Sequence, residues 1–191
     1  GGANILDPVR LVSTWTAPLG PANAEAVVTR LREMGSAFVA THGSGTASTF
    51  DDVPDWDLIR VSALDLDEAT ADALAEEFCG NKEMYVNKAV LPYNGLWAID
   101  FTLAGVDKAT GVARVGDTLG VDPANMVAVG DSYNDLPMLQ SCGFSVAMGN
   151  APPEVKAAAD FVAPPVSEDG LAVAIFEYVL PRILAKTAGY Y

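Results

Sequence analysis

The residues best suited to chemistry are two carboxylates and an amide that follow an apolar segment, at Asp131, Asn134 and Asp135. The apolar run 126–129 is typical of a strand buried on both faces, and Pro137 opens a periodic segment that predicts a helix. In open α/β sheets, ligands bind at the carboxyl ends of strands, and a helix N-terminus offers N–H groups to an anion. Mg²⁺, held by one or two carboxylates and by phosphate oxygens, fits such an edge. The alternative interpretation is that these residues only cap a helix.

A lysine stands where another helix is predicted to begin. The pattern predicts a helix over residues 108–119, with Lys108 at its start. A cation at this end of a helix is unfavourable against the macrodipole unless an anionic group lies nearby. Lys108 therefore indicates a neighbouring anion, and the alternative is an ordinary solvated helix residue.

These residues belong to a series of five segments that resembles the haloacid dehalogenase-like phosphohydrolases. The resemblance is to the Cof-type branch, whose cap domain is of type IIB. The segments occur in the order of that family and cover the chain from residue 105 to about residue 180. They are Gly105–Lys108, Gly130–Asp135, Met148–Ala151, Val155–Asp160 and Glu168–Leu171.

The resemblance implies a mechanism and a role for each residue. Such enzymes attack a small phosphorylated metabolite, a sugar or cofactor phosphate, with an aspartate, and water then hydrolyses the aspartyl-phosphate. Lys108 would neutralise charge on the transferring phosphoryl group. Asp131 would bind Mg²⁺, and Asp135 would support that site or add a ligand. Asn134 would hold phosphate or orient Lys108.

The first motif of the family, Asp-x-Asp-Gly-Thr or Asp-x-Asp-Gly-Val, does not occur in these 191 residues. Asp65 and Asp67 imitate it, but Glu68 replaces the glycine and Asp67 is a natural cap for the amphipathic segment that follows. We therefore expect a chain that lacks the nucleophile segment and is inactive by itself, although its parent protein is a phosphatase. The alternatives are a binding or assembly partner without catalysis and a phosphotransferase similar to phosphomannomutases.

Two domains are expected, an α+β cap over residues 1–104 and the C-terminal half of an α/β core with a parallel sheet over residues 105–191. In the cap, the order strand, helix, strand occurs twice and a further strand follows. The cap segments are 11–16, 22–34, 37–40, 58–64, 67–78, 84–90 and 97–103. In the core, helices and strands alternate, which favours parallel pairing. The core segments are 108–119, 126–129, 136–141, 144–147, 153–159, 161–163 and 171–184.

A small polar loop with the chain's single histidine is expected over residues 41–48. Through the resemblance, His42 and Ser44 are candidates for a surface of the cap that faces the substrate. The alternative is a flexible turn, because Gly and Ser favour turns for conformational reasons alone.

Composition and charge restrict the partners. The net charge of −14 would repel nucleic acid and anionic membranes, and no apolar stretch reaches the length of a membrane span. No secretory signal is apparent and the two cysteines have no metal-ligand spacing, so a cytoplasmic protein is expected. If the nucleophile strand is missing, the edge of strand 126–129 is unpaired. Self-association or a complementary N-terminal segment is then expected to cover it.

Overall fold

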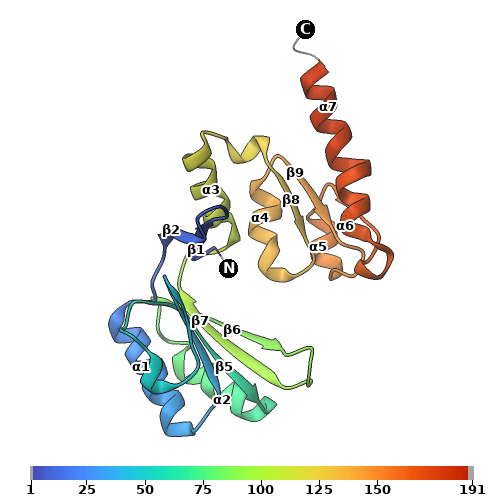
Figure 1. Cartoon of the computed structure of the whole chain (residues 1–191). Coiled ribbons are helices and arrows are strands. Elements are labelled where there is room, and N and C mark those ends of the chain that lie inside the picture. Colours follow the sequence, from blue (N-terminus) through green and yellow to red (C-terminus); the bar gives the residue numbers. More distant parts are fainter. Residues whose placement is uncertain (1, 189–191) are drawn as a thin grey trace. The chain divides into compact units, whose positions relative to one another are not determined.

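The computed structural model describes residues 2–188, with side chains through residue 184, and divides into two compact units. The N-terminal unit comprises residues 3–106, and the C-terminal unit comprises Gly2 and the chain from Asp107 onward (Figure 1). Residue 1 and residues 189–191, the outer ends of the two expected domains, lie outside the described residues. No helix in the described part of the chain is both long and apolar enough to cross a membrane.

A five-stranded antiparallel sheet forms the N-terminal unit, with the strand order β4-β3-β5-β7-β6. Strands 84–90 and 97–103 are confirmed at both ends. The expected strand 58–64 extends to residue 66, the expected strand 37–40 covers residues 38–42, and strand 45–47 was not expected. The polar segment 41–48 is a β-hairpin rather than a loop, because β3 and β4 pair from Ala40 and Ala47 to His42 and Gly45. The strands are β3 Phe38–His42, β4 Gly45–Ala47, β5 Leu58–Leu66, β6 Met84–Val90 and β7 Trp97–Leu103.

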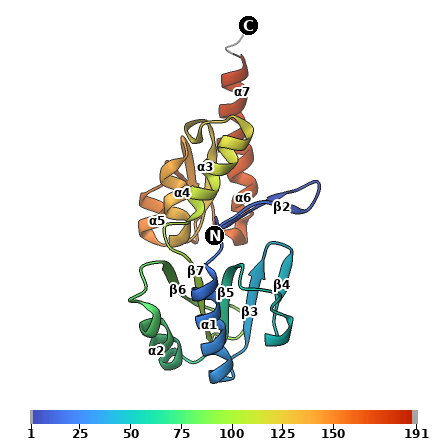
Figure 2. The same ribbon diagram turned by 90° about the vertical axis from the view of Figure 1, so that its left-hand side faces the viewer.

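Two helices, α1 Pro21–Met34 and α2 Glu68–Phe78, cover one face of this sheet (Figure 2). Helix α1 ends at Gly35, whose left-handed φ of 62° is unfavourable for residues with a β-carbon. The backbone N–H of Thr70 donates to the Asp67 carboxylate at 2.8 Å, which confirms Asp67 as the N-cap of α2. The layer of two helices on one sheet agrees with the expected α+β arrangement.

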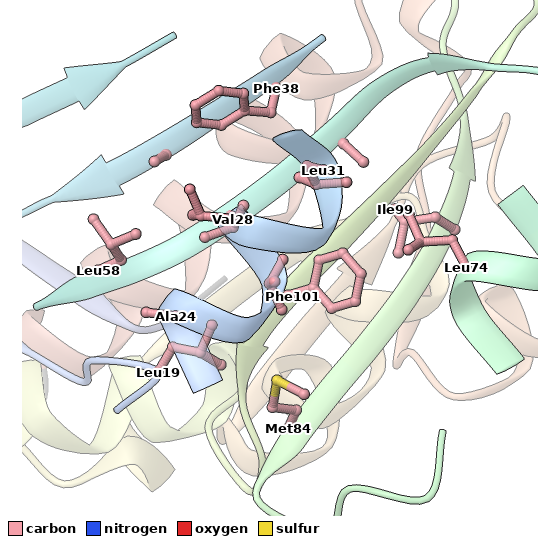
Figure 3. Close-up of a cluster of buried hydrophobic side chains, with 14 of the residues drawn as sticks. Leu19, Ala24, Val28, Leu31, Phe38, Leu58, Leu74, Met84, Ile99 and Phe101 are labelled. Atoms are coloured by element: carbon pink, nitrogen blue, oxygen red, sulfur yellow. The ribbon is translucent and has the colours of Figure 1, made fainter. Parts of the chain in front are cut away.

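The main core lies between these helices and the sheet. Figure 3 shows Val28 and Leu31 of α1 against the sheet, and Leu74 of α2 beside Ile99 of β7. Phe101 of β7 lies in the middle of the cluster and is fully buried. Alternate residues of each strand point into this core, so the pairing register is set by which residues are apolar.

The predicted strand 11–16 exists but is wrongly placed in the expected repeat. Strand β2, Val12–Thr16, pairs with β1, Asn4–Asp7, in a separate antiparallel hairpin. The Asp7 carboxylate accepts hydrogen bonds from the backbone N–H groups of Val9 and Arg10, which stabilises the turn. Local pairing across this short turn satisfies the backbone of β2 without the larger sheet.

A bulge in β5 lies where the five-stranded sheet packs against the β1–β2 hairpin. The register between β3 and β5 shifts at this point, because Thr41 pairs with Arg60 whereas His42 pairs with Leu58. Leu58 therefore enters the main core, and its neighbour Ile59 enters a second cluster. The buried members of that second cluster are Ala3, Ala17 and Ile59, with Trp15, Leu103 and Val106 packed against them.

A three-stranded parallel sheet, in the order β10-β9-β8, forms the centre of the C-terminal unit. This confirms the expected parallel sheet, and helix 108–119 is confirmed at both ends. The strands are β8 Val127–Gly130, β9 Phe144–Ala147 and β10 Phe161–Val162, and the helices are α3 Lys108–Leu119, α4 Leu136–Ser141 and α5 Pro153–Ala157. All four residues of β9 are buried, as the central strand of such a sheet requires.

The C-terminal segment 171–184 was expected to form one α-helix, and this prediction is wrong in its middle. Helix α6, Gly170–Val173, continues as a π-helix over Ala174–Val179 and then as α7, Leu180–Ala188. The wider turn changes which side chains share a face, so the apolar periodicity of the sequence does not continue across it. Phe176, for example, is 68% exposed.

The position of Phe101 yields a stability prediction. Phe101→Ala should lower the free energy of unfolding of the N-terminal unit by about 3–5 kcal/mol, because it leaves a cavity among well-packed side chains. Val90→Ala at the exposed end of β6 is the control and should change it by less than about 0.5 kcal/mol. Urea unfolding followed by circular dichroism measures both. A similar small loss for the two variants would contradict the assigned core.

Candidate functional site

Lys108 is the first residue of α3, and the helix start is fixed by the residue before it. The backbone N–H of Thr110 donates to the Asp107 carboxylate at 2.9 Å, and the Asp107 N–H contacts the Thr110 hydroxyl. This capping box determines where the lysine leaves the backbone. The Lys108 ammonium then donates to the carboxylate of Asp135.

Asp135 is the most heavily bonded carboxylate of the unit. Its Oδ1 accepts from Lys108, and its Oδ2 accepts from the backbone N–H groups of Asp131 at 3.0 Å and Ser132 at 3.1 Å. The residue is only 4% exposed. Because a buried charge must be paired, Lys108 and the two amides are the groups that allow Asp135 to be buried.

The pKa of Asp135 reflects this balance. Burial is the largest single influence and raises the pKa. The hydrogen bond and charge of Lys108, together with the amides of Asp131 and Ser132, oppose burial and outweigh it. The pKa of Asp135 therefore lies below its usual value, and the carboxylate is ionised at neutral pH.

Gly130, the last residue of β8, makes room for this carboxylate. A β-carbon at Gly130 would lie 2.5 Å from the Asp135 Cβ and 2.7 Å from its Cγ. These separations are too short for carbon atoms, so glycine is required where the carboxylate returns toward the strand end. A glycine therefore ends the apolar run because any larger residue at position 130 would clash with Asp135.

Asp131 lies at the same strand end but is exposed. The side-chain amide of Asn150 donates to its Oδ2 at 3.2 Å, and the Asn150 carbonyl oxygen accepts from the Val166 backbone N–H at 3.1 Å. Asn150 thus ties Asp131 to two other segments of the unit. Asn150 lies in one of the five segments of the resemblance, but no role was predicted for it, because a separation of 19 residues from Asp131 provides no local signal.

Asn134 is exposed and is not bonded to Lys108 among the described interactions. Its carbonyl oxygen lies 2.8 Å from the Ser132 hydroxyl, which also contacts Asp135 at 3.1 Å. The side chain that contacts Lys108 in the structure is Asp135 rather than Asn134.

A cavity of about 510 Å³ opens beside these residues, and only residues 108–172 line it. Lys108, Asp131 and Asp135 contribute its charged wall, together with Asp169, for which no role was predicted from the sequence. Asp169 has a left-handed φ of 54° and an exposed side chain. The remaining lining is mostly apolar or glycine: Val129, Gly130, Met148, Val166, Gly170, Leu171 and Ala172.

The donor set at the cavity fits part of a magnesium site. Asp131 offers an exposed carboxylate, whereas both oxygens of Asp135 already accept hydrogen bonds. Mg²⁺ in proteins keeps several waters and is often bound by one or two carboxylates with substrate phosphate. Within the described residues, no group of three or more His, Cys, Asp or Glu side chains could hold a metal.

His42 and Ser44 lie in the N-terminal unit, on the β3–β4 hairpin. The His42 Nδ1 and the Ser44 hydroxyl are 3.0 Å apart, so the two candidates do contact each other. Asp65 of the imitation motif has a left-handed φ of 57°, and its Oδ1 accepts from the Tyr93 hydroxyl and the Asn94 amide. These bonds attach the β6–β7 connection to the end of β5.

Comparison with known sequences places this site in a family context. The model of the haloacid dehalogenase-like hydrolases matches residues 33–175. The 5-amino-6-(5-phospho-D-ribitylamino)uracil phosphatase of Bacillus subtilis is 38% identical over 114 residues, which are 60% of this chain and 44% of the relative. A phosphoglycolate phosphatase of Methanothrix thermoacetophila is 33% identical over 119 residues, 61% of this chain and 48% of the relative. The matched region thus spans less than half the length of either relative.

Comparison with solved structures agrees on the fold. A haloacid dehalogenase-like hydrolase from Bacteroides thetaiotaomicron aligns with a TM-score of 0.76 over 91% of this chain and 73% of that chain. The sequence identity of that alignment is 21%, so the likeness shows a shared fold.

The lowered pKa of Asp135 predicts a pH-dependent stability. Asp135→Asn should lower the free energy of unfolding by about 2 kcal/mol at pH 7, because it removes a charge-assisted hydrogen bond. A carboxyl group with a depressed folded-state pKa stabilises the fold above its unfolded-state pKa of about 4. This stabilisation is lost as the pH falls through the lower folded-state pKa.

The difference in the free energy of unfolding between the unsubstituted 191-residue chain and Asp135→Asn should therefore become smaller in acid. Denaturant unfolding at a series of pH values measures it. Asp117→Asn removes the same charge at an exposed position of α3 and serves as the control. A difference that stays constant down to about pH 2 would show that the ionised carboxylate does not stabilise the unit.

Proposed function

This chain belongs to the haloacid dehalogenase-like hydrolase family, and we propose that it is part of a Mg²⁺-dependent phosphatase acting on a small phosphorylated metabolite. The observation that carries the proposal is the Lys108–Asp135 pair at the carboxyl end of β8, with Asp131 beside it. A cation and an exposed carboxylate at one cavity suit a phosphate and its metal ion. The two curated relatives described above are phosphatases.

Each residue at the cavity has a role in this proposal. Asp131 binds Mg²⁺, which when bound supplies positive charge for the phosphoryl oxygens. Lys108 neutralises charge on the phosphoryl group, and Asp135 holds the ammonium in place. Asp135 thus supports the site, since its oxygens are occupied. Asn134, exposed beside them, contacts the phosphate.

The attacking aspartate is proposed to lie in a segment of the parent protein outside these 191 residues. The chain contains no Asp-x-Asp-Gly-Thr or Asp-x-Asp-Gly-Val sequence. Its nearest imitation is engaged structurally, because Asp67 caps α2 and Asp65 binds Tyr93 and Asn94. We therefore assign this chain the cap domain, residues 1–104, and the C-terminal part of the core, residues 105–191.

The substrate class rests on the relatives and the cavity. The Bacillus subtilis relative acts on a phosphorylated ribityl compound and the Methanothrix thermoacetophila relative on phosphoglycolate, according to their names. Both substrates are small and hydroxylated or carboxylated. We propose a sugar or cofactor phosphate of similar size for the parent of this chain.

The 191-residue chain should hydrolyse p-nitrophenyl phosphate with Mg²⁺ slowly or not at all, because Lys108 and the metal only assist a nucleophile. A version extended N-terminally through the first family motif should be active. In that version, Asp131→Ala should abolish metal-dependent turnover, and Lys108→Ala should reduce kcat by about 10³-fold.

The fold of Asp131→Ala should be unchanged by circular dichroism, because Asp131 is exposed, and Asp117→Ala should keep normal activity. Robust turnover by the short chain that disappears in Asp65→Asn would overturn the assignment. The imitation motif would then supply the nucleophile.

We further propose that a complementary N-terminal segment, or self-association, covers the free edge of β8. In the described residues, β8 pairs on one side only, with β9. Val127 on this strand is 36% exposed. Exposed apolar side chains also follow the C-terminal helical run, at Leu171, Phe176, Leu180, Ile183 and Leu184. An unpaired strand edge beside apolar surface favours pairing with another chain.

Light scattering should therefore show that the 191-residue chain forms oligomers, and a peptide carrying the first family motif should convert it to a smaller complex. Amide hydrogen exchange should show weak protection of Val127–Gly130 in the absence of such a partner. A monomer in which these amides are as protected as those of β5 would contradict the proposal.

A further inference from the structure

Asn150 contacts two residues that line the cavity, although it does not line the cavity itself. It lies in the turn after β9 and is exposed. Its side-chain amide donates to the Asp131 Oδ2 at 3.2 Å, and its side-chain carbonyl oxygen accepts from the Val166 N–H at 3.1 Å. Asn150 therefore acts on the cavity through a carboxylate on one side and a backbone group on the other.

These two contacts determine which end of the Asn150 amide faces the carboxylate. An amide group has a donor end and an acceptor end. If the amide turned over, its carbonyl oxygen would face the Asp131 carboxylate and its NH₂ group would face the Val166 N–H. Neither pair could then form a hydrogen bond. The contact with Val166 thus directs the NH₂ group toward Asp131.

The backbone around Asn150 is held as well. The Gly149 N–H donates to the Pro164 carbonyl at 3.2 Å, and Ala151 is only 4% exposed. A β-carbon at Gly149 would lie 2.6 Å from the Pro165 nitrogen, which is too short for any residue but glycine. The turn after β9 therefore packs directly on the segment that leads to Val166, and the two anchors of the Asn150 side chain keep a constant separation.

Asp131 is held at one oxygen and open at the other. Asn150 donates to its Oδ2, and within the described residues no hydrogen bond reaches its Oδ1. Mg²⁺ demands nearly ideal octahedral geometry, so a carboxylate ligand has to present its oxygen in a defined direction. Asn150 removes rotational freedom that an unrestrained, exposed carboxylate would lose only when it bound the ion. Asp131 is thus prepared to bind a metal ion through Oδ1.

We propose that Asn150 is a positioning residue of the metal site, which orients the Asp131 carboxylate and thereby sets its affinity for the ion. This role rests on the proposed function, because it takes Asp131 as the Mg²⁺ ligand. Removal of a residue that hydrogen-bonds a metal ligand typically lowers metal affinity by about 10–100-fold. The alternative is that Asn150 only joins two turns of the fold, and its effect on metal binding would then be independent of Asp131.

The test measures Mn²⁺ binding to the N-terminally extended version without substrate, by electron paramagnetic resonance of the free ion. Asn150→Ala should raise the Kd for Mn²⁺ by about tenfold or more, because Asp131 loses the group that orients it. Asn150→Ser, whose side chain is too short to bridge both partners, should raise it similarly. At saturating Mg²⁺, kcat should stay close to that of the unsubstituted version, because the bound ion then orients the carboxylate.

A double-mutant cycle separates positioning from a merely structural role. In the Asp131→Ala background, Asn150→Ala should leave the Kd for Mn²⁺ unchanged, because no carboxylate remains to be oriented. An equal increase of the Kd in both backgrounds would show that Asn150 only supports the local fold.

Asn94→Ala is the matched control in the N-terminal unit. The Asn94 amide donates to the Asp65 carboxylate at 2.7 Å, and its carbonyl oxygen accepts from the Leu96 N–H at 3.0 Å. The substitution removes the same pair of hydrogen bonds from residues that do not line the cavity, so the Kd for Mn²⁺ should not change.

The same measurements distinguish failure of this role from failure of the metal site. If Asp131→Ala binds Mn²⁺ weakly but Asn150→Ala binds it normally, Asn150 has no positioning role and the proposed metal site stands. If Asp131→Ala also binds Mn²⁺ normally, Asp131 is not a metal ligand, and the metal assignment and the role of Asn150 both fail.

Discussion

The C-terminal unit depends on the burial of one carboxylate. Asp135 is almost inaccessible to solvent, and its charge is tolerated only because Lys108 and two backbone amides reach it. Those partners come from the start of α3 and from the turn after β8, so the carboxylate fixes both segments relative to each other. Gly130 has to be small for the same reason. The exposed Asp131 is thereby held at a defined position while its own carboxylate stays available at the cavity.

The two sheets present their functional groups in different ways because they are buried differently. The parallel sheet is covered on its faces, so its polar groups gather beyond the strand ends, where the cavity lies. The antiparallel sheet has helices on one face only, so alternate residues of its strands display polar groups across the other. A ligand would therefore approach the parallel sheet at the carboxyl ends of its strands.

Local sequence patterns predicted the helices and strands well. They predicted less well which strands pair and which distant side chains contact each other. Helix 108–119 has a capping residue and a glycine at its end, and the sequence marks both limits. The proximity of Lys108 to an anion also followed from the helix dipole alone. Strand 11–16 was identified, but alternation does not specify which strand it pairs with. The contact of Asn150 with Asp131 and the π-helical turn depend on tertiary packing, which no local pattern encodes.

The bulge in β5 lets two consecutive residues serve two different cores. Leu58 packs in the main core on the side of α1, and Ile59 packs in the cluster of the β1–β2 hairpin, each with 3% exposure or less. In a regular strand Leu58 would lie on the same face as Arg60, outside the main core. A short hairpin is marginally stable by itself, so its persistence depends on this shared strand. Unfolding of the five-stranded sheet would remove Ile59, against which the β1–β2 hairpin packs. We therefore expect the sheet and this hairpin to unfold together within the N-terminal unit.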